Sequence, residues 1–189
     1  MFLEHSERNY NPMIKKVVKK QENAHDCFVC GLDNSSGLKT TYFELEDETV
    51  VGIAVAQSIH QSYTNTVHGG VITALLDETI GRAIKVFEPE TWGVTVEINV
   101  TFKAPVPYDS QLVVTGRITE NNGKLFFGEG ELILPDGTVA ALGTGTFYKM
   151  KASRLESRGA DRNMMKLYIN DDDPTEIDIP VYVHSEVNA

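Results

Sequence analysis

A histidine, a pair of glycines and an acidic pair stand at a fixed spacing within one apolar stretch of the chain. Gly69 and Gly70 follow His68, and Asp77 and Glu78 come a little over two helical turns later. Backbone N–H groups at a helix start can polarise an oxygen, because they have no partner inside the helix. A carboxylate midway along an apolar helix is costly to bury without a partner. The spacing therefore predicts a site that holds a carbonyl group and attacks it.

These residues lie in a segment that we expect to form a buried helix over 69–86, ending near Pro89, because its apolar residues fall on most helical faces. Two strand-like runs precede this helix and four follow it, at 38–46, 49–57, 94–102, 110–120, 124–134 and 138–149. Only one long helix is available for about six strands. We therefore predict an α+β fold in which an antiparallel sheet wraps around one long central helix.

The two ends of the chain differ in composition from this central part. Residues 1–24 carry lysines around a few apolar residues, and we expect them to form an amphipathic helical arm. Residues 152–189 are polar and acidic, and we expect a loosely held tail with a short strand at 164–170. The folded domain is therefore expected to span 25–151.

The composition excludes several classes of function. The chain has 189 residues and a net charge of −10, which argues against a nucleic-acid partner because that partner needs a basic surface. It shows no apolar run long enough for a membrane span and no signal-peptide pattern at its start, so we expect a cytoplasmic protein. Two cysteines fit a reducing compartment and do not make a disulfide framework.

The order of elements resembles that of the hotdog-fold acyl-CoA thioesterases, and most closely their phenylacetate-pathway-like branch. Two strands come first, then His68-Gly69-Gly70, an apolar helix with Asp77, and four further strands. The segment from Cys27 to Leu38 also resembles a leader of many bacterial members. The resemblance covers roughly 25–150. It implies hydrolysis of an acyl-CoA thioester without metal or organic cofactor. It also implies a homodimer or homotetramer with one continuous sheet across two subunits and active sites between them.

The resemblance also implies roles for individual residues. Asp77 matches the catalytic carboxylate, which acts as general base or as nucleophile, and the sequence leaves both open. Gly69 matches the backbone N–H that polarises the carbonyl. His68 is expected either to touch the thioester or to hold the loop. Glu78 is the alternative candidate for the catalytic carboxylate. We expect it instead to pair with Arg82, so Asp77→Asn should abolish hydrolysis while Glu78→Gln leaves most of it.

A third polar group is expected on the strand that follows the helix. Thr95 stands eighteen residues after Asp77, where related proteins often place Ser or Thr to orient water. By strand alternation, Glu97 and Asn99 share a face with Thr95, and this face lines either the cleft or the solvent.

The loop before His68 departs from the family pattern. An Asn or Gln is usual six residues before the histidine, whereas this chain has Ser62 there, with Gln61 adjacent and Asn65 nearby. A one-residue shift of the loop would restore Gln61. The full set of expected substrate-binding residues is Gly70, Gln61, Ser62, Asn65, Glu78, Gly81 and Lys103.

Two observations keep alternatives open. Cys27 and Cys30 are spaced like a metal or redox pair, but His25 is the only further ligand nearby and zinc needs four, so we expect a packed turn and no metal unless two subunits share a site. The missing Asn or Gln favours a second hypothesis, a non-catalytic acyl-CoA sensor or carrier on the same fold. Retention of Asp77 counts against that hypothesis.

Overall fold

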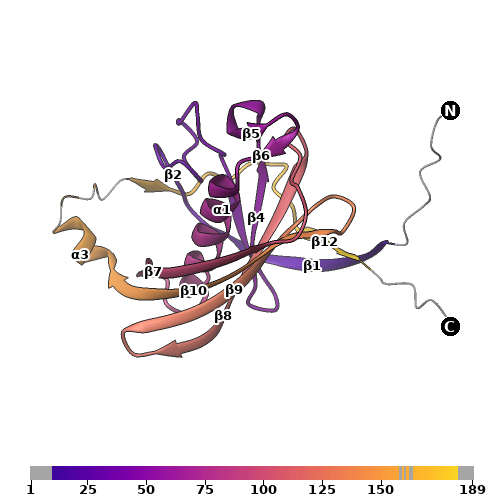
Figure 1. Cartoon of the computed structure of the whole chain (residues 1–189). Helices are drawn as coiled ribbons and strands as arrows, with labels where there is room; N and C mark the ends of the chain where they lie inside the picture. The colour runs from indigo at the N-terminus through magenta and orange to yellow at the C-terminus, as the bar shows by residue number, and fades with distance from the viewer. Residues whose placement is uncertain (1–9, 158, 160, 162–163, 183–189) are drawn as a thin grey trace, which may run out of the picture.

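The computed structural model describes residues 10–157, 159, 161 and 164–182 and shows one sheet curved around a central helix (Figure 1). Neighbouring strands of this sheet are antiparallel, in the order β12-β1-β3-β4-β8-β9-β10-β7. The strands are β1 (Tyr10–Lys20), β3 (Thr41–Leu45), β4 (Val50–Val55), β7 (Thr91–Phe102), β8 (Gln111–Asn122), β9 (Leu125–Ile133), β10 (Val139–Lys151) and β12 (Glu176–Tyr182). The predicted α+β hotdog fold is confirmed, with eight strands in the main sheet where about six were expected.

The central helix runs from α1 (Gly69–Arg82) into the short α2 (Ile84–Phe87), close to the predicted helix over 69–86. His68 is the N-cap of α1, and its backbone is extended at φ −64° and ψ 135°. No helix among the described residues is long and apolar enough to cross a membrane.

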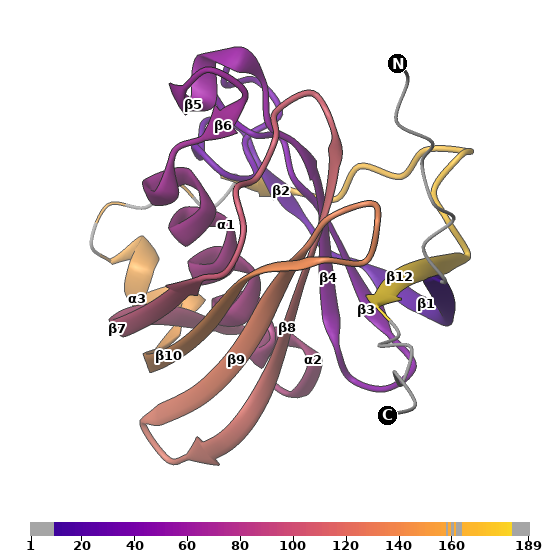
Figure 2. The ribbon, with the colours of Figure 1, turned by 45° about the vertical axis from the view of Figure 1, so that its right-hand side comes forward.

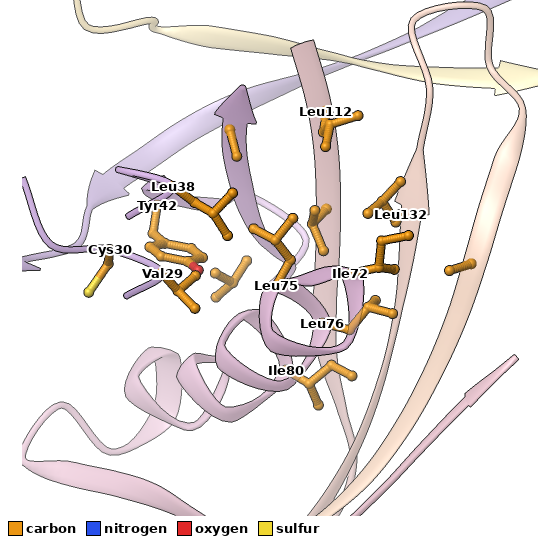
Figure 3. Packing of buried hydrophobic residues seen from close by; sticks show 14 of the residues in the cluster. Val29, Cys30, Leu38, Tyr42, Ile72, Leu75, Leu76, Ile80, Leu112 and Leu132 are labelled. Carbon is orange, nitrogen blue, oxygen red and sulfur yellow. The ribbon is translucent and has the colours of Figure 1, made fainter. Parts of the chain in front are cut away.

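The core lies between α1 and the sheet, where the leucines and isoleucines of the helix meet those of β8 and β9 (Figure 3). Leu75, Leu76 and Ile80 are fully buried. Burying each such side chain contributes about 1.5–3 kcal/mol relative to leaving it in water. The helix approaches the sheet closely because glycines face it: a Cβ at Gly116 would lie 2.6 Å from the Thr79 carbonyl oxygen.

Smaller elements cover the ends of this core. They are β2 (Asn23–Ala24), which pairs with β11 (Met165–Lys166), and β5 (Gln61–Tyr63), which pairs with β6 (Thr66–Val67). A 3₁₀ turn, η1 (Ser58–His60), and a short helix, α3 (Ala152–Glu156), complete the described elements.

The predicted helical arm is wrong for the described part of 1–24. Residues 10–20 form β1, which pairs with β12 on one side and with β3 on the other. Figure 2 shows β1 and β12 side by side, away from α1. The spacing of apolar residues fits a helix as well as a strand, and pairing with distant strands decided the outcome. Residues 1–9 lie outside the described residues.

The tail is also more ordered than predicted. Glu176–Tyr182 forms β12 in the main sheet, and Ile177 and Ile179 are buried in a second apolar cluster with Phe43 and Val51. The strand expected at 164–170 is reduced to β11, and residues 183–189 lie outside the described residues. The predicted loosely held tail is therefore wrong for β12.

Candidate active site

A pocket of about 240 Å³ lies beside the second half of α1 and receives Asp77. Thr95 on β7 also lines it, and its hydroxyl donates a hydrogen bond of 2.8 Å to Asp77 Oδ1. The other lining residues come from β2 and the loop after it, from α1 and α2, from β7 and β10, and from the start of β11: Ala24, Cys27, Cys30, Glu78, Gly81, Arg82, Lys85, Thr91, Trp92, Gly93, Phe147, Met164 and Met165. The structure thus brings together Asp77, Thr95, Glu78 and Gly81 of the predicted site.

The surroundings of Asp77 make its carboxylate a stronger base than usual. Burial raises its pKa above the ordinary aspartate value, the hydrogen bond from Thr95 opposes this rise, and the charge of Glu78 adds to it. A carboxylate that is poorly solvated, yet held by one donor, is suited to take a proton or to attack a carbonyl.

A β-bulge decides that Thr95 faces the helix. The pairing of β7 with β10 shifts at Val96, which is an extra residue between Thr95 and Glu97. An extra residue reverses the face to which the following side chains point. Glu97 and Asn99 therefore line a separate hollow with residues of β8, β9 and β10, and the predicted common face with Thr95 is wrong.

The helix start carries the three other predicted residues of the motif. The Gly70 N–H donates to His68 Nδ1 over 2.9 Å, so His68 holds the turn as its N-cap. No hydrogen bond between described residues uses the Gly69 N–H, which leaves this donor available to a ligand. A Cβ at Gly69 would meet the Phe102 ring at 3.3 Å, which places the helix start next to the C-terminal end of β7.

A single chain does not join the two halves of the predicted site. Gly69 and Asp77 are eight residues apart on α1, and a helix rises 1.5 Å per residue, so they are separated by about 12 Å along its axis. Neither His68 nor Gly69 lines the pocket that holds Asp77. A single thioester carbonyl cannot reach both groups within one chain.

The remaining predicted substrate-binding residues are spread over the surface. Gln61 and Ser62 lie in β5 and are exposed, and Asn65 lies in the turn before β6 with a positive φ of 61°. Lys103 lines a hollow next to β8 and β9, which is a different cavity from the one that holds Asp77. None of these four residues lines the Asp77 pocket.

Glu78 is engaged with the protein on both carboxylate oxygens. Its Oε1 accepts from Arg82 Nη2 at 2.9 Å and from Nε at 3.0 Å, which confirms the predicted pair. Its Oε2 accepts from the Cys27 thiol at 3.2 Å, a contact that sequence reasoning missed. The Cys-x-x-Cys spacing was visible in the sequence, but nothing local indicated that Glu78 would meet it.

A second cation borders the pocket. Lys85 lies 4.1 Å from the centre of the Trp92 ring, and burial lowers its pKa. Lys85 also lies 3.8 Å from Glu22 Oε2, so its charge on the pocket wall is partly balanced by a carboxylate.

Comparison with known proteins gives this geometry a context. Residues 64–141 match the family described as the thioesterase superfamily. A Schizosaccharomyces pombe protein of uncharacterised function is 31% identical over 98 residues, which is 50% of this chain and 56% of that protein. Mouse acyl-coenzyme A thioesterase 13 is 26% identical over 94 residues, which is 50% of this chain and 67% of that protein. The chain thus aligns with just over half to two thirds of these relatives' length.

Solved structures share the fold. The crystal structure of a thioesterase superfamily protein superposes with a TM-score of 0.60 at 26% identity, covering 66% of this chain and 60% of the other. The Escherichia coli PaaI protein, from the phenylacetic acid degradation operon, superposes with a TM-score of 0.55 at 15% identity, covering 60% of this chain and 80% of the other. At this identity the second likeness shows the fold alone.

Proposed function

Because the chain has the hotdog fold and its residues 64–141 match the thioesterase superfamily, we propose that it is an acyl-CoA thioesterase. The reaction is hydrolysis of an acyl-CoA thioester to the carboxylic acid and free CoA. One observation carries the proposal: Asp77 lies in a pocket, its pKa is raised, and one of its carboxylate oxygens accepts a hydrogen bond from a hydroxyl group. The name of the mouse relative, an acyl-coenzyme A thioesterase, supports the substrate class.

Asp77 has two chemical routes in this pocket. As a general base it takes a proton from water, the hydroxide attacks the carbonyl carbon, and the C–S bond breaks as the CoA sulfur takes a proton. As a nucleophile it attacks the carbonyl carbon itself, the C–S bond breaks, and CoA leaves as its sulfur takes a proton; water then hydrolyses the mixed anhydride and frees Asp77. In both routes Thr95 holds Oδ1 and leaves Oδ2 for the reaction.

We infer that the second half of the site comes from another copy of the chain. β7 is an edge strand of the sheet, and Val96 and Phe102 on it are 62% and 52% exposed. An exposed edge of this length is a template for pairing with a second strand. We assign this edge to a twofold dimer in which β7 pairs antiparallel with its copy, giving one continuous sheet.

In this dimer the separation of about 12 Å between Gly69 and Asp77 of one helix does not matter, because the two groups at one site come from different chains. Asp77 contacts Thr95 near the N-terminal end of β7, whereas Gly69 lies beside Phe102 at its C-terminal end. Antiparallel pairing places the C-terminal end of one β7 next to the N-terminal end of the other. Gly69 of the partner subunit then approaches the pocket of Asp77 and can donate its N–H to the developing oxyanion.

A release assay for free thiol tests the function. The full-length protein is incubated with short, medium, long and aromatic acyl-CoAs, and Asp77→Asn is expected to lose at least about 10²-fold in kcat. Asp172→Asn is the matched control, because this aspartate is exposed and lies outside both the pocket and β7. Absence of turnover with every acyl-CoA contradicts the proposal.

The same assay distinguishes a thioesterase from the alternative, a non-catalytic acyl-CoA sensor or carrier. Ser62 stands where the family usually has Asn or Gln, and this departure favours the alternative. Tight binding of an acyl-CoA by the wild type without release of thiol would establish the carrier and exclude the thioesterase.

The phenylacetate-pathway branch, the choice between homodimer and homotetramer and the cytoplasmic location stay predictions. A preference for aromatic acyl groups in the panel would support the branch.

A further inference from the structure

Two cysteines and a glutamate meet at the wall of the Asp77 pocket. The ligand atoms of Cys27, Cys30 and Glu78 all lie within 4.8 Å of one another. The cysteines belong to the loop before β3 and the glutamate to α1, so the fold brings together residues about fifty positions apart. Cys30 is fully buried at the margin of the core (Figure 3).

We propose that Cys27, Cys30 and Glu78 bind a zinc ion, with the fourth position open to the pocket. Two thiolates and a carboxylate are a donor set that zinc accepts, and the sulfur ligands favour zinc over magnesium or calcium. Zinc sites with three protein ligands keep the fourth position for water or another small ligand. All three side chains line the same cavity as Asp77, which gives the ion a path from solvent.

The loop is already shaped to present Cys27 as a ligand. The backbone N–H groups of Val29 and Cys30 donate to Cys27 Sγ at 3.3 and 3.4 Å. Such donors stabilise a thiolate and are a recurrent feature around metal-bound sulfur. The loop then turns tightly at Gly31, where a Cβ would lie 2.3 Å from the Cys27 carbonyl oxygen, so that only glycine fits.

Arg82 supplies the outer support of the proposed site. It holds Glu78 through Oε1 and so orients Oε2 toward Cys27, as an outer hydrogen bond orients a ligating carboxylate. Arg82 is 6% exposed. The charges of zinc and the guanidinium balance those of two thiolates and one carboxylate. Filling the site therefore adds no net charge to a buried region.

The ion would tie the loop before β3 to α1 next to the reacting carboxylate, and so fix one wall of the pocket. Both cysteines are free thiols in the structure, and a Cys27–Cys30 disulfide would remove both sulfur ligands. This inference does not depend on the proposed hydrolysis, because the readouts below measure the ion.

The test measures metal in the full-length protein. Protein purified under reducing conditions without added metal, and then loaded with zinc and desalted, is expected to hold about one zinc ion per chain by elemental analysis. Cobalt(II) in place of zinc is expected to give the intense ultraviolet band of thiolate-to-cobalt charge transfer. Titration of free thiols and the intact mass record the state of the cysteines.

Variants assign the ligands. Cys27→Ser and Cys30→Ser are each expected to lose the cobalt band, and Glu78→Gln to weaken zinc binding at least about tenfold. His25→Ala is the matched control and should keep full stoichiometry, because His25 pairs with Asp33 at 2.9 Å rather than with the cluster. Two titratable thiols with no bound metal and no cobalt band would overturn the proposal. So would a disulfide in the reduced preparation.

Discussion

The proposed sharing of the active site between subunits makes a quantitative prediction about mixed dimers. Gly69→Pro removes one backbone N–H from the helix start, and Asp77→Asn removes the carboxylate. Gly69 is the first residue of α1, where proline is tolerated because its N–H has no helical acceptor. The extended backbone of His68, at φ −64° and ψ 135°, suits the residue before a proline. The substitution should therefore remove the donor while leaving the helix intact.

The expected losses follow from the chemistry of each group. Loss of one oxyanion donor costs about 3–4 kcal/mol of transition-state stabilisation, or about 10²–10³ in kcat. Each homodimer, of Gly69→Pro or of Asp77→Asn, therefore has very low activity. In a heterodimer one pocket receives both defects and the other receives none, so we expect about half of the wild-type kcat.

The two variants are co-expressed with different affinity tags, purified through both tags and assayed for thiol release. Gly69→Ala is the control for the proline, because it keeps the N–H and adds a methyl group 3.3 Å from the Phe102 ring. It should keep most of the activity. A heterodimer that is no more active than the two homodimers would refute the shared site, and with it the assignment of Gly69 as oxyanion donor to the Asp77 of another subunit.

Three further predictions follow from the surroundings of Asp77 and Glu78. Because burial raises the pKa of Asp77, this carboxylate takes up a proton at a higher pH than an ordinary aspartate does. As the pH is lowered, the activity should therefore be lost earlier than an ordinary aspartate would predict. Thr95→Val removes a donor that lowers this pKa and should move the acid limb of kcat/KM to still higher pH. The pKa of Asp77 is higher in the folded protein than in the unfolded chain. The protonated carboxyl group therefore stabilises the fold at a pH below its pKa in the unfolded chain, and this stabilisation is lost as the pH rises through its pKa in the folded protein. Asp77→Asn should therefore melt no lower than the wild type at neutral pH, and a clear drop in its melting temperature would contradict a functional rather than structural role. Glu78→Gln leaves the buried Arg82 without its carboxylate and should cost about 3 kcal/mol in urea unfolding. An unchanged midpoint would show that the pair is not needed for the fold. Whether the folded variant keeps most of the hydrolysis, as expected from the sequence, is read in the same thiol assay.

The sequence determined the features that depend on neighbouring residues. The apolar faces of the segment 69–86 identified the buried helix, and alternation and turn residues identified the strands that follow it. These apolar and alternating patterns repeat along the chain at the period of the element, so a single sequence is enough to show them. Asp77 and Thr95, which the structure joins by a hydrogen bond, were matched through the resemblance to the hotdog-fold family.

Tertiary packing decided the remaining features. Pairing between distant strands made residues 10–20 a strand and drew residues 176–182 into the sheet. One extra residue at Val96 turned Thr95 toward the helix and Glu97 away from it. The third partner of Cys27 and Cys30 came from α1, about fifty residues further along. Each of these outcomes depends on contacts between segments far apart in the chain. These contacts form, and stabilise the protein, only once the sheet has closed around the helix.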